Sequence, residues 1–171
     1  TSAAVYARDL ETILFRSWIY AGHVSQLPAV GSYFLVELGS ESFIVVRSAD
    51  DTIRAFANVC RHRGSHVCYE AAGNAKLFVC PYHAWSYELD GSLKAARHVS
   101  KPLDKAAFGL KPVHARIVEG LIFICFADAP PALSRVSSSG EFTLYELQAV
   151  DLYGGPAKFC DCLKGVARGG S

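Results

Sequence analysis

Two short stretches of the chain concentrate the residue types that bind transition metals. Cys60-Arg61-His62 and Cys80-Pro81-Tyr82-His83 each offer one thiol and one imidazole, and 17 residues separate His62 from Cys80. Thiolates and neutral imidazoles are ligands that proteins use for zinc and for iron–sulfur centres. The spacing therefore predicts a metal site built from two loops, with Cys60, His62, Cys80 and His83 as its ligands.

Two kinds of site use two cysteines and two histidines as ligands. Structural zinc sites prefer C-x2–4-C and H-x3–5-H pairs, whereas the order in this chain is C-x-H and C-x2-H. In a Rieske [2Fe–2S] centre, two thiolates bind one iron and two histidines bind the other. The sequence favours this second arrangement, and a zinc-stabilised interaction domain remains the alternative.

The sequence predicts the roles of several other residues less specifically than those of the four ligands. His66 and Cys68 lie close to His62, but the second loop has a single Cys–His pair, so we interpret both as bystanders. Arg61 and Arg63 either steer an acidic ferredoxin partner, offset the negative charge of the cluster, or form a solvated surface. Trp85 and Tyr87 are expected to pack behind the cluster, and Gly64 and Pro81 to form the tight turns of the loops. Cys125 is expected to be a buried apolar residue, and no role is assigned to Cys160 or Cys162.

The segments that position these loops are predicted to be mostly β. One amphipathic helix is expected over residues 2–18, with Ser2 available as its N-cap. Short apolar runs separated by turn residues follow, which is typical of antiparallel strands. The strands are expected at 32–38 and 41–47 around Gly39-Ser40, at 53–59, at 77–80, before and after Asp90-Gly91, and at 113–118 and 121–126 around Glu119-Gly120.

Composition limits the classes of function. The 171 residues suit one domain with a real core, and the net charge of +1 gives no electrostatic case for nucleic acid or an anionic membrane as partner. No apolar run approaches the roughly 18 residues of a membrane span, and no basic and then hydrophobic leader is visible. A cytoplasmic setting is therefore expected, in which six cysteines act as thiols or metal ligands.

The pattern C-x-H-x17-C-x2-H, in the form CRHRG…CPYHAW, resembles the Rieske domain of ring-hydroxylating oxygenase α subunits, the Rieske non-haem iron oxygenases. RSWIYAGH at 16–23, IRAFANVCRHRG, CPYHAWSYELDG and GLIFICF near 120–126 carry the likeness over about residues 3–130. The stretches AARH at 95–98 and GLKPVHARIVEGLIFICFAD resemble the branch with glycine-betaine and choline monooxygenases. The resemblance implies a mainly β fold: an N-terminal helix, an antiparallel sandwich-like base and a small cluster-binding subdomain.

The chain also departs from the family. Rieske proteins that oxidise quinols carry a disulfide that joins their two ligand loops. The matching positions in this chain are Ser65 and Tyr82, so this disulfide cannot form. We also expect few hydrogen-bond donors at the sulfurs and a low reduction potential. After His83 only His98 and His114 remain, so no two-histidine, one-carboxylate iron site is present. We expect a Rieske domain at 1–130 and, at 131–171, a tail foreign to the family that reflects truncation or a frameshift.

The predicted function is one-electron transfer through the cluster. The resemblance implies a full-length enzyme that takes electrons from a reductase or ferredoxin, passes them to mononuclear Fe(II) in the absent catalytic domain, and uses O₂ to hydroxylate or demethylate a small organic substrate. It also implies a homotrimer in which one subunit serves the iron of the next. Whether this chain is itself an enzyme stays open, and a free-standing Rieske-type ferredoxin is the alternative carrier.

Overall fold

The computed structural model describes residues 2–97, 99 and 102–133. The structure begins with α1 (Ala3–Thr12). Ser2 caps the N-terminus of this helix, because its side chain accepts a hydrogen bond from the backbone N–H of Ala4. The helix ends earlier than predicted, because a 3₁₀ turn, η1 (Leu14–Arg16), takes over and buries Leu14. No helix of the described residues is long and apolar enough to cross a membrane.

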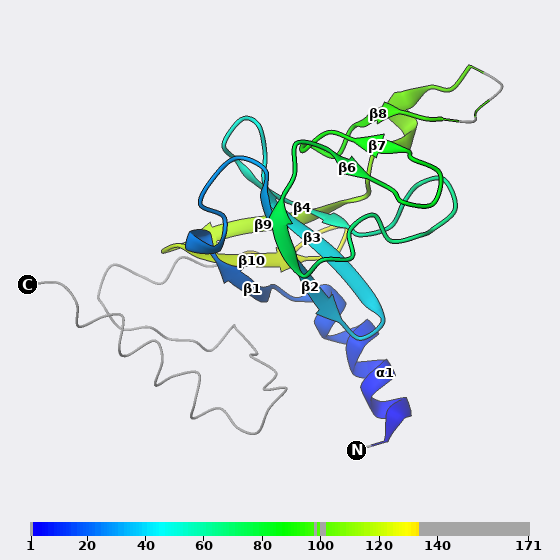
Figure 1. Cartoon of the computed structure of the whole chain (residues 1–171). Helices are drawn as coiled ribbons and strands as arrows, with labels where there is room; N and C mark the ends of the chain where they lie inside the picture. The colour runs from blue at the N-terminus through cyan, green and yellow to red at the C-terminus, as the bar shows by residue number, and fades with distance from the viewer. Residues whose placement is uncertain (1, 98, 100–101, 134–171) are drawn as a thin grey trace, which may run out of the picture. The chain divides into compact units, whose positions relative to one another are not determined.

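Seven antiparallel strands form the larger sheet, in the order β1-β10-β9-β4-β3-β2-β5 (Figure 1). The β2–β3, β4 and β9–β10 strands lie close to where the sequence predicts them. Two edge strands, β1 and β5, were not predicted individually. The bounds are β1 (Ile19–His23), β2 (Ser32–Leu38), β3 (Glu41–Arg47), β4 (Ile53–Ala57), β5 (Ala72–Asn74), β9 (Pro112–Val118) and β10 (Leu121–Cys125).

A smaller antiparallel sheet carries the second predicted ligand loop. Its order is β6-β7-β8, with β6 (Phe78–Val79), β7 (Ser86–Tyr87) and β8 (Leu93–Ala95). The predicted turn at Asp90-Gly91 lies between β7 and β8, and Gly91 adopts a φ of 85° that favours glycine. Two further 3₁₀ turns complete the elements: η2 (Val24–Gln26) and η3 (Lys105–Phe108).

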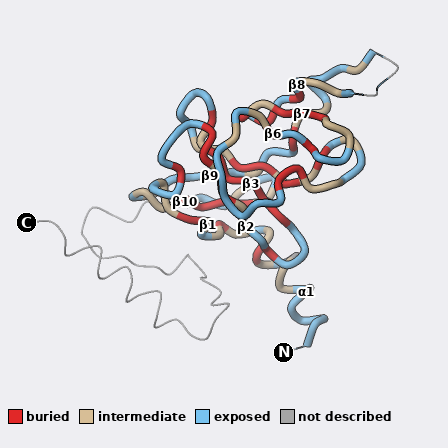
Figure 2. The backbone as a smooth tube through the Cα atoms, in the orientation of Figure 1, coloured by how far each residue is buried: buried red, intermediate tan, exposed pale blue. Residues whose placement is uncertain are grey.

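Strand β3 is buried on both faces, as the red tube in Figure 2 shows along this strand. Its alternating side chains divide between two apolar clusters. Phe43 and Val45 pack with Ile122 and Ile124 of β10, so the large sheet curls around this cluster, which we call the sheet core. Ile44 and Val46 pack instead against the smaller sheet, in a cluster that we call the loop core.

The loop core connects the fold to the predicted metal site. It contains both predicted cysteine ligands, Cys60 and Cys80, together with Trp85 and Tyr87. The mainly β fold with one N-terminal helix and a separate small sheet confirms the predicted fold class. The predicted boundary at residue 130 stays a prediction. Residues 134–171, His98, Cys160 and Cys162 lie outside the described residues.

Candidate metal centre

The two predicted ligand loops have the same backbone conformation. In the first loop, the N–H of Cys60 donates to the carbonyl of Ser65 (2.8 Å) and the N–H of Gly64 donates to the carbonyl of Cys60 (3.0 Å). In the second, the N–H of Cys80 donates to the carbonyl of Trp85 (2.8 Å) and the N–H of Ala84 to the carbonyl of Cys80 (2.9 Å). The short internal repeat seen in the sequence therefore corresponds to a repeated structure.

Each loop needs one residue in the left-handed region at the same position. Gly64 has φ 74° and Ala84 has φ 56°, each four residues after its cysteine. The predicted turn role of Gly64 is confirmed. The sequence did not reveal the matching role of Ala84, because alanine rarely adopts this conformation.

The two cysteines lie together and deep in the loop core. Cys60 is 3% exposed and Cys80 is 2% exposed. Burial raises the pKa of the Cys60 thiol, and the nearby Cys80 thiol raises it further. Two adjacent buried sulfurs with little contact to water are a donor pair for a soft metal ion.

The two predicted histidine ligands also form a pair, closer to the surface. The rings of His62 and His83 are edge-to-face, with centroids 4.6 Å apart and 77° between their planes. Both residues are half-buried. The Nδ1 atom of His62 is buried and has no hydrogen-bond partner within the described part of the chain. Buried polar atoms normally have a partner, so this ring nitrogen suits a metal bond.

The four predicted ligands form two pairs, Cys60 with Cys80 and His62 with His83. Within residues 2–97, 99 and 102–133, no three or more His, Cys, Asp or Glu side chains gather closely enough to hold one metal ion. A [2Fe–2S] centre of the Rieske type takes only two protein ligands on each iron. The thiol pair and the imidazole pair have the chemistry that such a centre requires.

Tyr87 occupies a more specific place than the sequence suggested. Its hydroxyl accepts a hydrogen bond from the backbone N–H of Arg61 (3.0 Å) and lies 3.2 Å from the Sγ atom of Cys60. Because burial raises the pKa of this phenol, it stays protonated and its O–H is free to donate to the sulfur. We expected few donors at the sulfurs; no sequence pattern reveals this one, since Tyr87 is 27 residues from Cys60.

Trp85 packs against the ring of His62, and its predicted place behind the cluster stays a prediction. Its indole stacks on the ring of His62, with centroids 4.8 Å apart and 8° between the planes. The indole N–H donates to the carbonyl of Arg97 (3.2 Å), and the ring contacts Phe108 edge-on at 6.0 Å. The loop between β8 and β9 thus supports one face of His62.

The remaining residues of the first loop lie near the site. Cys68 is buried in the loop core, and burial raises the pKa of its thiol to about 12. His66 is half-buried and its ring lies 5.9 Å from that of Tyr69. Arg61 and Arg63 are exposed. Their roles as bystanders or steering charges stay predictions, whereas the buried apolar role of Cys125, which is 0% exposed, is confirmed.

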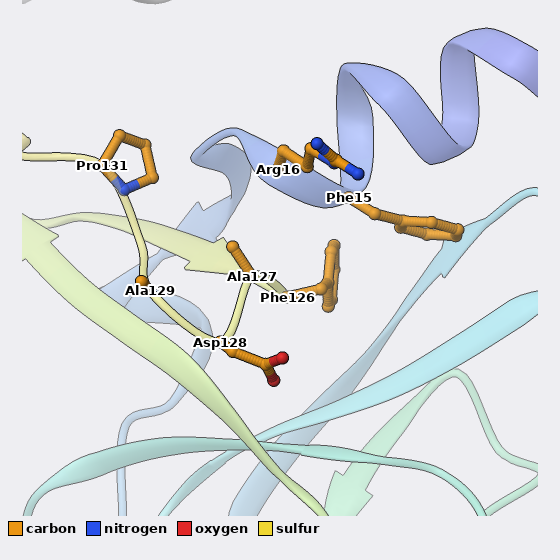
Figure 3. Close-up of a pocket in the computed structure, with 7 residues that line it drawn as sticks. All are labelled: Phe15, Arg16, Phe126, Ala127, Asp128, Ala129 and Pro131. Atoms are coloured by element: carbon orange, nitrogen blue, oxygen red, sulfur yellow. The ribbon is translucent and has the colours of Figure 1, made fainter.

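A pocket of about 550 Å³ lies elsewhere, between η1 and the segment after β10. Figure 3 shows Phe15 and Arg16 on the side of η1, with Phe126, Asp128 and Pro131 around the rest of the wall. Phe15 and Phe126 meet edge-to-face at 5.6 Å. None of the four predicted ligands lines this pocket, so it is separate from the candidate metal centre.

Comparison with known proteins identifies the same region. The model of the Rieske [2Fe-2S] domain family matches residues 17–114. The glycine betaine monooxygenase oxygenase subunit of Chromohalobacter salexigens is 44% identical over 130 residues, which are 75% of this chain and 29% of that protein. The large oxygenase component of a naphthalene 1,2-dioxygenase system from Pseudomonas aeruginosa is 42% identical over 135 residues, 75% of this chain and 30% of that protein.

Solved structures agree with the sequence matches. A quaternary ammonium Rieske monooxygenase, described in terms of carnitine oxidation and inter-subunit electron transfer, has a TM-score of 0.71 at 34% identity. The match covers 77% of this chain and 37% of that one. In the sequence matches, the chain spans about three-tenths of the length of the two curated relatives named above.

Proposed function

The chain belongs to the Rieske [2Fe–2S] domain family, and on this basis we propose that it carries single electrons with Cys60 and Cys80 bound to one iron and His62 and His83 to the other. The observation that carries this proposal is the sorting of the four side chains by depth and by type. The thiols form a buried pair, and the imidazoles form a half-buried pair with their rings 4.6 Å apart. When bound, the cluster supplies a site that accepts and releases one electron.

The residues around the four ligands determine how the cluster is held. The repeated loop conformation directs one cysteine and one histidine from each loop to the same place. Tyr87 holds its proton at the hydroxyl and offers it to the Cys60 sulfur. Trp85 shields one face of the His62 ring from water. An imidazole that binds a metal through Nδ1 keeps Nε2 available to carry a proton, so electron gain can be coupled to proton gain.

For the whole protein we propose an oxygenase α subunit with this domain at residues 1–130. The relatives named above are oxygenase components, which supports this assignment. The electron donor is then a reductase or ferredoxin, and the acceptor is mononuclear Fe(II) in a catalytic domain that the first 130 residues do not include. We propose further that the enzyme is a homotrimer in the cytoplasm; the inter-subunit electron transfer described for the quaternary ammonium monooxygenase supports an assembly of several subunits.

The substrate class is a proposal about the whole protein as well. The relatives act on glycine betaine and naphthalene according to their names, at 44% and 42% identity. We propose a small organic substrate, with quaternary amines preferred because of the 95–98 and 109–128 stretches that resemble the glycine-betaine and choline monooxygenase branch.

The test is metal and sulfide analysis of the purified full chain, followed by EPR after reduction with dithionite. The proposal predicts two irons and two acid-labile sulfides per chain, with a rhombic EPR signal from the reduced cluster. A colourless protein that contains zinc and gives no signal would contradict it. Cys60→Ser should lose both irons. Cys125→Ser, which changes a buried thiol in strand β10, is the matched control and should retain them.

A further inference from the structure

Asn58 lies at the junction of β4 and the first ligand loop and is fully buried. It follows β4 directly, two residues before Cys60, and its exposed fraction is 0%. Its backbone N–H donates to the carbonyl of Ser42 (2.8 Å), which extends the pairing of β4 with β3. The backbone of Asn58 is therefore part of the rigid sheet, while its side chain is available to act on the loop.

The side-chain amide of Asn58 makes four hydrogen bonds. Its Oδ1 accepts from the backbone N–H of Val67 (3.0 Å) and of Cys68 (2.8 Å). Its Nδ2 donates to the carbonyl of Cys68 (2.7 Å) and to the Oγ of Ser42 (3.0 Å). An asparagine side chain has two donors and two acceptor positions, so its whole capacity is used.

These partners also fix the orientation of the amide. If Oδ1 and Nδ2 were exchanged, two donors of the amide would face the N–H groups of Val67 and Cys68. An aspartate would place a second oxygen against the carbonyl of Cys68, and an apolar side chain would leave buried backbone groups unpaired. Among similar side chains, asparagine alone satisfies every partner.

The bonds join the two ends of the loop that contains Cys60 and His62. One end is anchored by Asn58 in the sheet, and the other by Val67 and Cys68. No covalent bond closes this loop, since Cys60 and Cys68 are both free thiols. Because the amide lies away from water, its bonds are not exchanged for bonds to solvent.

We propose that Asn58 is a positioning residue, which closes the first ligand loop non-covalently and so holds Cys60 and His62 in place for the cluster. This inference rests on the proposed ligand assignment. The support extends to the surface, because the Oγ of Ser42, which accepts from Asn58, donates in turn to the Oε1 of the exposed Glu37 (2.8 Å). The chain of bonds runs in one direction, so each bond polarises and strengthens the next.

The experiment compares four variants of the full chain carrying its cluster. Asn58→Ala removes all four side-chain bonds, and Ser42→Ala removes one of them. Asn74→Ala is the matched control, because Asn74 also connects distant segments, donating to the carbonyl of Val30 (3.0 Å), but touches neither ligand loop. Val45→Ala is the stability control, since it weakens the sheet core without touching the loop core.

Three quantities are measured: the rate of cluster loss to excess chelator, the EPR line shape, and hydrogen exchange at the amides of Val67 and Cys68. Asn58→Ala should lose its cluster about tenfold faster than the unmodified chain, which is the scale of losing buried hydrogen bonds. It should also broaden the EPR lines and expose both amides to exchange. Ser42→Ala should change all three in the same direction by less, and Asn74→Ala should change none.

The inference is wrong if Asn58→Ala behaves like Val45→Ala, with a lower unfolding temperature but an unchanged EPR line shape and unchanged cluster loss. If Asn58→Ala does not yield folded protein, Ser42→Ala against Asn74→Ala decides the question in the same way. An unmodified chain without a cluster would contradict the proposed function. Exchange at the two amides would then still test whether Asn58 closes the loop.

Discussion

The indole of Trp85 lies flat on the imidazole of His62, with 4.8 Å between the ring centroids and 8° between the ring planes. Trp85 is itself fixed, being 3% exposed and bound through its N–H to the carbonyl of Arg97. One face of a candidate ligand is thereby covered by a side chain that cannot easily move. We therefore expect this contact to hold the plane of the His62 ring.

Replacing Trp85 tests whether stacking orients His62. Trp85→Phe keeps an aromatic ring against the imidazole, whereas Trp85→Leu does not. We expect Trp85→Leu to reduce the free energy of unfolding by on the order of 2 kcal/mol through lost volume and to broaden the EPR lines of the reduced protein. Trp85→Phe should destabilise the fold as well, but with the lines unchanged. Equal spectra for the two variants would contradict the orienting role.

The hydroxyl of Tyr87 should raise the reduction potential of the cluster. Tyr87→Phe removes the donor 3.2 Å from the Cys60 sulfur while keeping the buried ring. A hydrogen bond worth about 1 kcal/mol more in the reduced state corresponds to a fall of roughly 40 mV when it is lost. Protein-film voltammetry measures the change. Tyr6→Phe, on a side chain of α1 that is 42% exposed, is the control and should leave the potential unchanged.

The repeated loop conformation predicts opposite effects at its two left-handed positions. Gly64→Ala should destabilise the protein by about 1 kcal/mol through backbone strain alone, because a Cβ atom there meets nothing within 4 Å. Ala84→Gly relieves the same strain at φ 56°, and this gain exceeds the added chain entropy of the unfolded state. Urea denaturation should place the two variants on opposite sides of the unmodified chain. A stabilised Gly64→Ala would refute the strain argument.

The thiol of Cys68 should resist alkylation in the folded protein. Burial raises its pKa to about 12, so almost no thiolate is present at pH 8. The unfolded chain releases this proton near the ordinary thiol pKa of about 8.5, while the folded chain keeps it, so stability should fall as the pH rises from about 9 toward 12. Peptide mapping after iodoacetamide treatment measures the labelling. Labelling of native Cys68 at pH 8 as fast as after unfolding would contradict the assignment.

Much of the fold could be predicted from local patterns. The β2–β3 hairpin is recognisable because apolar runs flank Gly39-Ser40, and the β9–β10 hairpin because they flank Glu119-Gly120. Strand β5 was missed because Ala72–Asn74 is exposed along its whole length and has no apolar face to reveal it. The helix was predicted too long because the apolar spacing continues through η1, where a 3₁₀ turn buries Leu14.

The candidate site was predictable in its ligand types but not in its supports. The spacing of Cys60, His62, Cys80 and His83 is local and specific. The supports depend on contacts between distant residues, such as Tyr87 with Cys60, 27 positions apart. Asn58 gave no signal, because a single asparagine in an alternating strand is indistinguishable from a turn residue until its partners are known.

Pulsed EPR on the reduced full chain labelled with ¹⁵N-histidine tests the ligand assignment most directly. The unmodified chain should show couplings to two histidine nitrogens, since two histidines bind one iron in a Rieske centre. His62→Cys should keep a cluster with one coupling and a lower potential, and His66→Gln, the matched control from the same loop, should keep both couplings. Loss of a coupling in His66→Gln, with both retained in His62→Cys, would contradict the account.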